Sequence, residues 1–166
     1  MIQALNLGDT TAFMLQSDLF LGMVLDQDRL LATQQEFLLG KWIAEARTWG
    51  ITADDKDQME RNARTLLTLW GPKAAAASLH DYANREWSGL LSSFYHARWK
   101  LWINLQEKLL RGDSATPIDW YTWEDAWTRE RGPFPEAPVG DPIAEARRIG
   151  EKYAALLRRS VESERS

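Results

Sequence analysis

Apolar residues recur at steps of three and four along almost the whole 166-residue chain, and this periodicity restricts the fold more than any other feature. Such spacing places apolar side chains on one face of an α-helix. No segment shows convincing alternation with a period of two, which a half-buried strand would require. We therefore predict an all-α fold: a bundle of about six helices with one long central helix. Residues 1–166 are expected to form a single α-helical domain.

Capping signals and Gly-Pro breaks predict where the helices begin and end. Thr33 and Glu36 have capping-box spacing for a helix that should run to Trp49. Another helix begins near Thr52 and ends at Trp70, because Gly71 and Pro72 cannot continue it. The remaining expectations are a helix over Phe13–Leu31 with a polar break at Asp26–Arg29, the long helix over Leu79–Leu110 capped by Ser78, a helix opening at Thr116-Pro117, a loop over Arg131–Gly140, and a last helix opening at Asp141-Pro142.

Composition argues against several classes of function. The formal net charge is −4 and there is no basic block, so we expect no nucleic-acid partner. Cysteine is absent, which excludes disulfides, thiol catalysis and zinc–thiolate sites. Two histidines cannot form a three-histidine site, and neither a metal nor a cofactor is expected. The most apolar segment, Leu19–Leu25, is much shorter than the roughly 20 residues needed to cross a bilayer, so no membrane partner is expected either.

No motif supplies catalytic residues. The chain contains no Ser/His/Asp order, phosphate-binding loop or glycine-rich dinucleotide motif. A glycosidase needs two carboxyl groups that flank the bond it cleaves. Asp81, Glu86, Glu124 and Asp125 are the candidates, but acids on helices usually lie on solvated faces, so no catalytic residue is assigned.

The nine tryptophans are a clear excess, and two aromatic residues have a special position. Seven tryptophans lie at helical spacing among aliphatic residues, where core packing is the default: Trp42, Trp87, Trp99, Trp102, Trp120, Trp123 and Trp127. Trp70 directly precedes the Gly-Pro break, so its ring can project from the end of the bundle. Tyr82 follows across a short connection, together with His80 and Asp81. Aromatic rings stack on sugar C–H faces while polar groups bind hydroxyls, so this rim is a candidate sugar-binding wall.

Three segments make the sequence resemble a known family. These are Leu67–Pro72 (LTLWGP), Asp81–Arg85 (DYANR) and Phe94–Trp99 (FYHARW). With further matching segments, they are similar in order and spacing to the C-terminal helical domain of the α-N-acetylglucosaminidases, glycoside hydrolase family 89, from about Thr11 to Leu157. The family includes lysosomal and bacterial enzymes, and no signal in this chain indicates its own location.

The resemblance implies a role in another domain's active site. Family members remove terminal α-linked N-acetylglucosamine with retention, using two glutamates on a (β/α)8 barrel that precedes the helical domain. Nothing in this chain resembles that barrel, so the chain alone should be inactive. Trp70, Tyr82 and Leu79 match positions that line the sugar pocket, and Arg64 matches a supporting arginine. The implied partners are the catalytic barrel and a glycan ending in N-acetylglucosamine.

The sequence departs from the family's pattern in two ways, and two other functions stay open. The connection from Lys73 to His80 is longer than in the lysosomal relative, and the start at Met1 within the opening helices predicts a fragment or a truncated reading frame. One alternative is a free-standing helical module that binds sugar or protein without catalysis. The other is a scaffold bundle that has no ligand.

Overall fold

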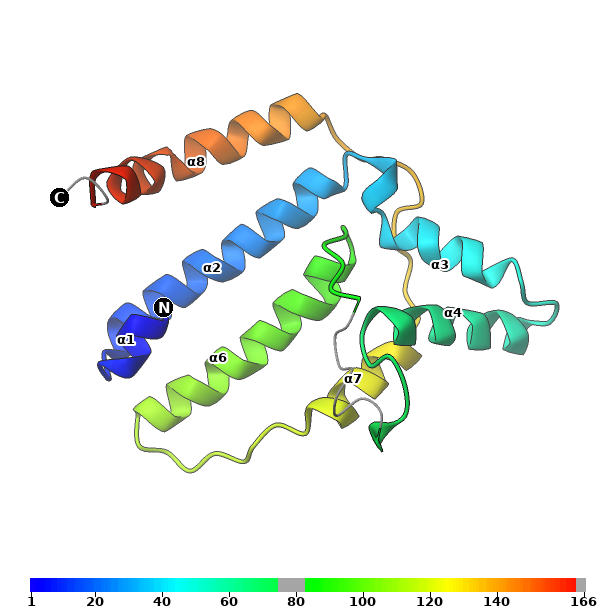
Figure 1. The fold of residues 1–166 in the computed structure, drawn as a ribbon, viewed down its shortest axis with the longest axis horizontal. Coiled ribbons are helices and arrows are strands. Elements are labelled where there is room, and N and C mark those ends of the chain that lie inside the picture. Colours follow the sequence, from blue (N-terminus) through cyan, green and yellow to red (C-terminus); the bar gives the residue numbers. More distant parts are fainter. Residues whose placement is uncertain (75–82, 164–166) are drawn as a thin grey trace.

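The computed structural model describes residues 1–74 and 83–163. Within them the secondary structure is helical and contains no strand, which confirms the all-α fold class. The helices labelled in Figure 1 are α1 (Ile2–Asn6), α2 (Thr10–Leu31), α3 (Leu39–Arg47), α4 (Ala53–Leu67), α6 (His96–Leu110), α7 (Trp120–Arg129) and α8 (Pro142–Ser163). A 3₁₀ turn at Gln35–Phe37 precedes α3, and a π-helical segment at Leu91–Tyr95 leads directly into α6.

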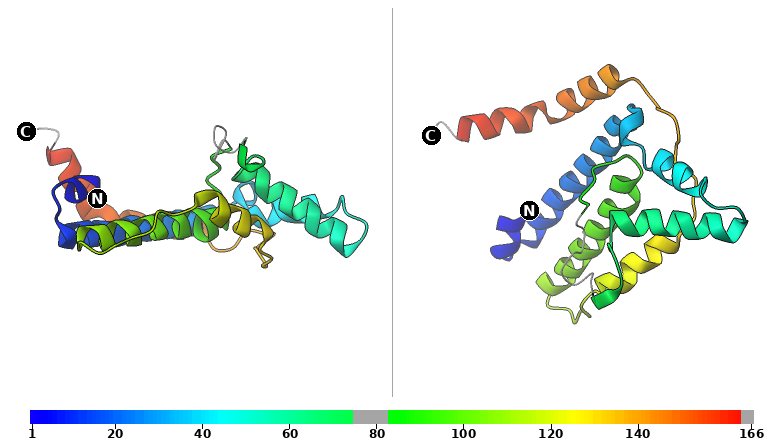
Figure 2. Two further views of the ribbon diagram at one scale, coloured as in Figure 1. Left: turned by 90° about the horizontal axis from the view of Figure 1, so that it is seen from below. Right: turned by 45° about the vertical axis from the view of Figure 1, so that its right-hand side comes forward.

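The helices form two packed groups, joined by the helical segment that runs from Leu90 through α6. Helix α2 lies between α6 and α8, and the α3–α4 hairpin packs on α7 at the other end (Figure 1 and Figure 2). One buried cluster consists of Leu39, Ile43, Leu67, Leu90, Phe94 and Trp127, and the other of Ala4, Phe13 and Ile103. Because Phe94 belongs to the first cluster and Ile103 to the second, the continuous helical segment ending at Leu110 joins the two groups.

The long central helix is shorter than the sequence predicts. Residues 84–87 are not helical, and the described helical segment that ends at Leu110 begins at Leu90; the predicted start at Ser78 and Leu79 lies outside the described residues. Ser88 forms an isolated parallel bridge with the segment before α3, where the amide of Leu39 donates to the carbonyl of Ser88 (3.0 Å). Although the apolar residues of 83–89 have helical spacing, this segment is not a helix.

Asp28 of α2 determines where this helix begins. Its Oδ1 accepts hydrogen bonds from the amides of Gly89 (2.7 Å) and Ser92 (3.0 Å), so a residue of another helix acts as the N-cap. Gly89 has φ +87°, a left-handed conformation that favours glycine. The polar break predicted at Asp26–Arg29 is wrong, because α2 runs unbroken and its carboxylates bind neighbouring elements.

Two of the other predicted helix starts are confirmed. Thr52 caps α4, and its hydroxyl and the Asp55 side chain form a complete capping box with the two backbone amides. Asp141 caps α8, where its Oδ1 accepts from the amides of Ile143 (2.8 Å) and Ala144 (3.0 Å). Each cap accepts hydrogen bonds from amides two or three positions later in the chain, which is why sequence spacing alone could identify both caps.

Two predicted starts are wrong. The Thr33 hydroxyl donates to a carbonyl in the last turn of α2 (2.7 Å) and does not open a helix. Helix α3 begins only at Leu39 and ends at Arg47, before the predicted end at Trp49. Helix α7 begins at Trp120 after the cap Asp119, and not at Thr116-Pro117.

The loop predicted at Arg131–Gly140 is present and packs tightly against α3. A Cβ atom added to Gly40 would lie 2.2 Å from the carbonyl oxygen of Pro135, closer than a real contact allows. Phe134 of the same loop packs on the first buried cluster. The absence of a side chain at Gly40 thus lets the loop close one end of the α3–α4–α7 group.

Helix α8 is held on α2 by a buried carboxylate. Asp26 is 5% exposed, and Lys152 Nζ and the Tyr153 hydroxyl each donate to its Oδ2 at 2.6 Å. Arg148 Nη2 lies 2.9 Å from Oδ1. Burial alone raises the pKa of Asp26, but the hydrogen bonds from Lys152, Tyr153 and Arg148 outweigh burial and lower the pKa to about 2.

We predict that Asp26→Asn lowers the free energy of unfolding by about 2 kcal/mol at neutral pH. The folded-state pKa of Asp26 lies below its ordinary value of 3.8, so the stabilisation is complete above about pH 4 and is lost as the pH falls towards 2. Denaturant unfolding between pH 2 and 7, followed by circular dichroism, measures the difference between the two proteins. Asp18→Asn, at an exposed position of α2, is the matched control and should follow the wild type. Equal stability of Asp26→Asn and wild type at pH 7 would contradict the prediction.

Candidate functional site

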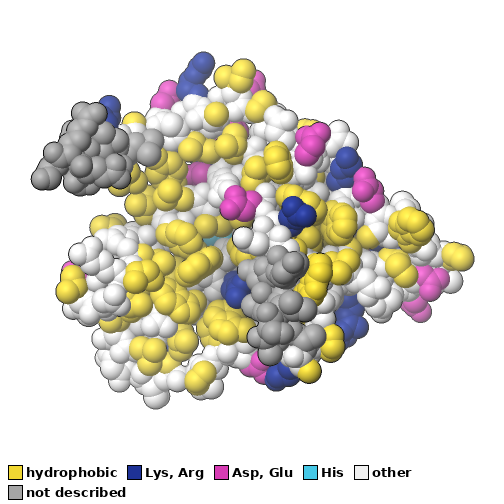
Figure 3. Space-filling model, viewed as in Figure 1, with side chains coloured by type: hydrophobic (Ala, Val, Ile, Leu, Met, Phe, Trp, Pro, Cys, Tyr) yellow, Lys and Arg dark blue, Asp and Glu magenta, His cyan; other side chains and the backbone are white. Residues whose placement is uncertain are grey.

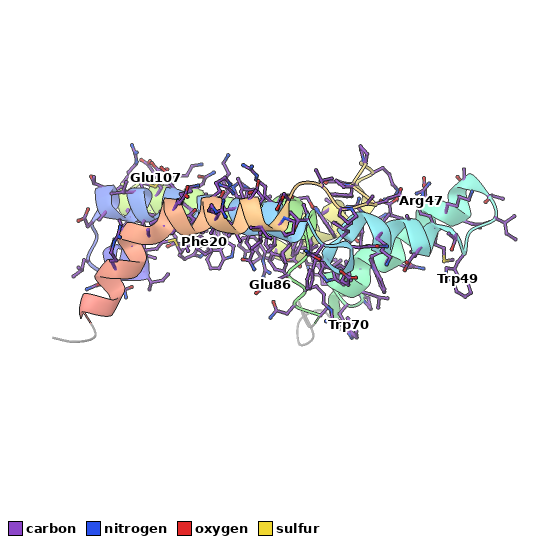
Figure 4. The ribbon with its side chains drawn as sticks, turned by 90° about the horizontal axis from the view of Figure 1, so that it is seen from above. Phe20, Arg47, Trp49, Trp70, Glu86 and Glu107 are labelled. Atoms are coloured by element: carbon purple, nitrogen blue, oxygen red, sulfur yellow. The ribbon has the colours of Figure 1, made fainter. Side chains whose placement is uncertain are left out.

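Trp70 lies just beyond the end of α4, at the surface of the bundle. The helix ends at Leu67, so Trp70 is not its last residue as predicted. Its indole is 37% exposed, and Figure 4 shows it projecting from the ribbon. The side chain is therefore partly exposed and not sealed inside the core.

An unusual backbone conformation presents this indole. Trp70 has φ +63°, a left-handed conformation that costs a residue with a Cβ roughly 1–2 kcal/mol. Buried neighbours hold the turn in place: Leu69 is 2% exposed, and the buried Thr68 hydroxyl donates to the carbonyl of Arg64 (3.0 Å). The Trp70 amide donates to the carbonyl of Thr65 (2.8 Å). Strained residues that persist in a well-packed setting are concentrated at functional sites, which makes Trp70 a functional candidate.

Arg64, the predicted supporting residue, is inside the core. It is 1% exposed, and its Nε donates to Glu60 Oε1 (3.0 Å). Its guanidinium lies 4.8 Å from the ring centroid of Trp127 and 5.2 Å from that of Phe134. Burial lowers the pKa of Arg64, and the Glu60 carboxylate opposes that shift. Arg64 therefore ties α4 to α7 and to the following loop, one turn before the segment that presents Trp70.

The other predicted site residues cannot be placed. Leu79, His80, Asp81 and Tyr82 lie outside the described residues. Asn84, which follows them, is exposed and has φ +43°. Asparagine tolerates this left-handed conformation better than most residues do. The sequence prediction that Trp70 and Tyr82 share a rim stays a prediction.

A groove lined by aromatic residues is a feature that the sequence analysis missed. It has a volume of about 650 Å³, and its lining residues are Ile2, Asn84, Tyr95, Arg98, Trp99, Trp102 and Trp120. We call it the aromatic groove. The spacing of its tryptophans predicts core packing, but Trp99 is 36% exposed. Helical periodicity identifies which face of a helix is apolar. It does not show whether that face packs against the rest of the same chain or against another protein surface.

Three of the four candidate acids are described, and Asp81 lies outside the described residues. Glu124 is fully buried and its Oε1 lies 3.3 Å from Arg98 Nε, so it is not the solvated acid that the sequence suggests. Asp125 pairs with Arg129 (2.8 Å). Glu86 accepts a hydrogen bond from Gln27 (2.6 Å). Each of these three acids thus has a structural partner.

The described residues contain no group of three histidine, aspartate or glutamate side chains that could hold a metal ion. Among them there is also no helix with the length and apolar character needed to cross a membrane.

We predict that Trp70→Gly is more stable than Trp70→Ala by about 1 kcal/mol, because only glycine adopts a positive φ without cost. The same pair of substitutions at Trp49 is the matched control. Trp49 is 82% exposed and has no positive φ, so there the alanine variant should be at least as stable as the glycine variant. Urea unfolding of the four variants measures both differences. An alanine variant at Trp70 that equals or exceeds the glycine variant would show that the left-handed backbone carries no strain.

Comparisons with known proteins bear directly on the family. The model of the α-N-acetylglucosaminidase C-terminal domain matches residues 1–152. Human α-N-acetylglucosaminidase is 32% identical over 131 residues, which cover 76% of this chain and 17% of the human protein. A family 89 glycoside hydrolase from Clostridium perfringens, solved with GlcNAc-α-1,4-galactose, superposes with a TM-score of 0.84 at 37% identity, over 92% of this chain and 18% of that chain. A complex of the family 89 enzyme of the same organism with PUGNAc has the same TM-score and identity over 91% of this chain.

The present chain therefore spans less than a fifth of the length of these relatives. The match extends over nearly all of its helices and includes the segments around Trp70 and Phe94 on which the resemblance was based. This chain belongs to the family of α-N-acetylglucosaminidase C-terminal domains.

Proposed function

We propose that this chain is the helical domain of a family 89 glycoside hydrolase and that it supplies one wall of the pocket for a terminal α-linked N-acetylglucosamine residue. The observation that carries the proposal is the exposed indole of Trp70, held in a strained turn at the end of α4. A rigid indole can stack on the C–H face of a sugar ring. Its fixed direction avoids the entropy cost of ordering a mobile side chain on binding.

The related structures support a carbohydrate ligand. The Clostridium perfringens enzyme was solved with the disaccharide GlcNAc-α-1,4-galactose, and 18% of its chain has the fold of this chain. This similarity supports a glycan that ends in N-acetylglucosamine as the ligand to which the present domain contributes binding contacts. Leu79 and Tyr82 would line the pocket beside Trp70, with His80 and Asp81 next to them, as the family motif implies. Arg64 would be a positioning residue, because it acts through the α4 backbone and does not reach the surface.

The chemistry itself is assigned to a catalytic (β/α)8 barrel that would pack beside this domain. A retaining glycosidase needs two carboxyl groups about 5–5.5 Å apart, one of which protonates the leaving group while the other attacks the sugar. The three described acids considered above are each occupied by a structural partner, and Glu124 is sealed from solvent. The domain would therefore contribute binding and exclusion of water, and not proton transfer or nucleophilic attack.

To test the wall, the C-terminal domain of the Clostridium perfringens enzyme is replaced by this chain, and Trp70→Ala is introduced into the chimera. We expect kcat/KM for an aryl α-N-acetylglucosaminide to fall at least tenfold, which corresponds to the loss of about 1.4 kcal/mol of transition-state binding. Trp49→Ala is the matched control, because it removes an equally large and more exposed indole at the far end of α4 (Figure 4). If both variants retain the parent kcat/KM, the domain is a scaffold and does not form the wall.

A titration of the isolated chain discriminates a half-pocket from a free-standing module. Tryptophan fluorescence should not change up to tens of millimolar N-acetylglucosamine, because half a pocket gives too little contact to bind a monosaccharide. The same preparation should release no aryl alcohol from an aryl α-N-acetylglucosaminide. Saturable binding at millimolar concentration or below, abolished by Trp70→Ala, would instead identify a free-standing sugar-binding module. Any hydrolysis by the purified chain would contradict the assignment of the chemistry to another domain.

A further inference from the structure

A second exposed tryptophan lies at the opposite end of α4 from Trp70. Trp49 is 82% exposed, in the turn that connects α3 with α4. Figure 3 shows hydrophobic side chains gathered over the end of the α3–α4 hairpin, at the right of the molecule. A single exposed apolar residue is ordinary on a protein surface, but Trp49 borders a groove between the two helices.

This groove has the size of a small-ligand site. Its volume is about 340 Å³, within the range of small-molecule pockets. Its lining includes Trp42, Glu45 and Trp49 from α3 and the turn after it, and Met59, Asn62 and Leu66 from α4. We call the groove formed by these six residues the hairpin groove.

The turn that presents Trp49 is held in a fixed position. Gly50 is buried against the start of α4, where an added Cβ atom would lie 2.4 Å from the amide nitrogen of Lys56. Beneath the groove, the indole nitrogen of Trp42 donates to the carbonyl of Ala63 (3.2 Å) and joins the two helices. A preformed site binds a ligand without the entropy cost of ordering its side chains.

One polar side chain from each helix accompanies the indole. The Glu45 carboxylate is 64% exposed, and its Oε1 lies 4.0 Å from Lys41 Nζ. Asn62 is exposed, and its Oδ1 accepts from Gln58 (2.8 Å), so its amide nitrogen can donate to a ligand. An aromatic face can stack on the C–H face of a sugar while such groups bind its hydroxyls. Because Glu45 is negatively charged, an uncharged sugar fits better than an acidic or sulfated one.

The hairpin groove leads along α4 towards Trp70. Met59, Asn62 and Leu66 follow one another at steps of three and four, so they share one face of this helix. Figure 4 shows Trp49 and Trp70 projecting on the same side of the ribbon. Helix α4 has 15 residues and is therefore about 22 Å long. A glycan that ends beside Trp70 needs several sugar units to reach Trp49.

We propose that the hairpin groove is a remote subsite for an uncharged inner part of the glycan whose terminal N-acetylglucosamine lies beside Trp70. This inference rests on the proposed function, because the terminal sugar must be held in that pocket. Once the terminal sugar is held, the rest of the chain has a high effective concentration at the groove. A contact too weak to bind a free monosaccharide then adds to the affinity for a long glycan.

The proposal distinguishes long substrates from short ones. A disaccharide or an aryl glycoside ends before it reaches the hairpin groove and gains no affinity from it. Trp49→Ala therefore remains a valid control for the aryl substrate, while it should impair the binding of a long glycan.

The test compares GlcNAc-α-1,4-galactose with an uncharged hexasaccharide that ends in α-linked N-acetylglucosamine, both as substrates of the chimera described above. Trp49→Ala and Asn62→Ala should each raise KM for the hexasaccharide about fivefold and leave kcat unchanged, because a remote contact stabilises the bound substrate and the transition state equally. Neither variant should change KM or kcat for the disaccharide. Ile51→Ala is the matched control, because Ile51 is 92% exposed in the same turn but does not line the groove. It should leave the kinetics of both substrates unchanged.

Circular dichroism checks that the variants fold. Unchanged hexasaccharide kinetics in folded Trp49→Ala and Asn62→Ala would overturn the proposal. An equal loss for both substrates would overturn it too, since the groove would then support the fold or a domain contact and not the distant part of a glycan. Trp70→Ala should lower kcat/KM for both substrates. If it does not, while Trp49→Ala still raises KM for the hexasaccharide alone, the wall at Trp70 is wrong and the remote contact is retained, so the two proposals fail separately.

Discussion

The hydrogen bonds from Gly89 and Ser92 to Asp28 are the constraint on which the rest of this structure depends. They fix the N-terminus of the helical segment that ends at Leu110, and that segment carries a residue of each buried cluster. Residues 84–87 are not helical, and Ser88 bridges to Leu38 at the start of α3. The way residues 88–92 enter the helical segment before α6 therefore depends on a carboxylate of α2.

Buried ion pairs lie in the elements that carry Trp70 and the aromatic groove. Arg64 pairs with Glu60 inside α4, the helix that precedes Trp70, and Arg98, which lines the aromatic groove, pairs with the buried Glu124. Removing one partner of such a pair leaves an uncompensated buried charge, which is strongly destabilising. Pairs of this kind confer geometric precision as much as stability, and that suits a domain that would complete a pocket belonging to another domain.

Sequence reasoning predicted the fold class well and the individual elements unevenly. The caps at Thr52 and Asp141 could be predicted because each side chain binds amides two or three positions later. The start of α6 could not, since its cap is 61 positions away from Gly89. At the candidate site, the exposure of Trp70 followed from the Gly-Pro break. The burial of Arg64 and the exposure of Trp99 could not be predicted, because an amphipathic pattern does not show what packs against each face of the helix.

The sequence by itself determined the all-α class, the helix starts at the local caps Thr52 and Asp141, and the family the chain joins, because these depend on residues near one another or on the order of short motifs. Only the tertiary structure decided which polar side chains are buried, which tryptophans stay exposed, and where the central helix begins. Those outcomes depend on desolvation and on hydrogen bonds between residues far apart in the chain. Such partners are brought together only when the whole bundle packs.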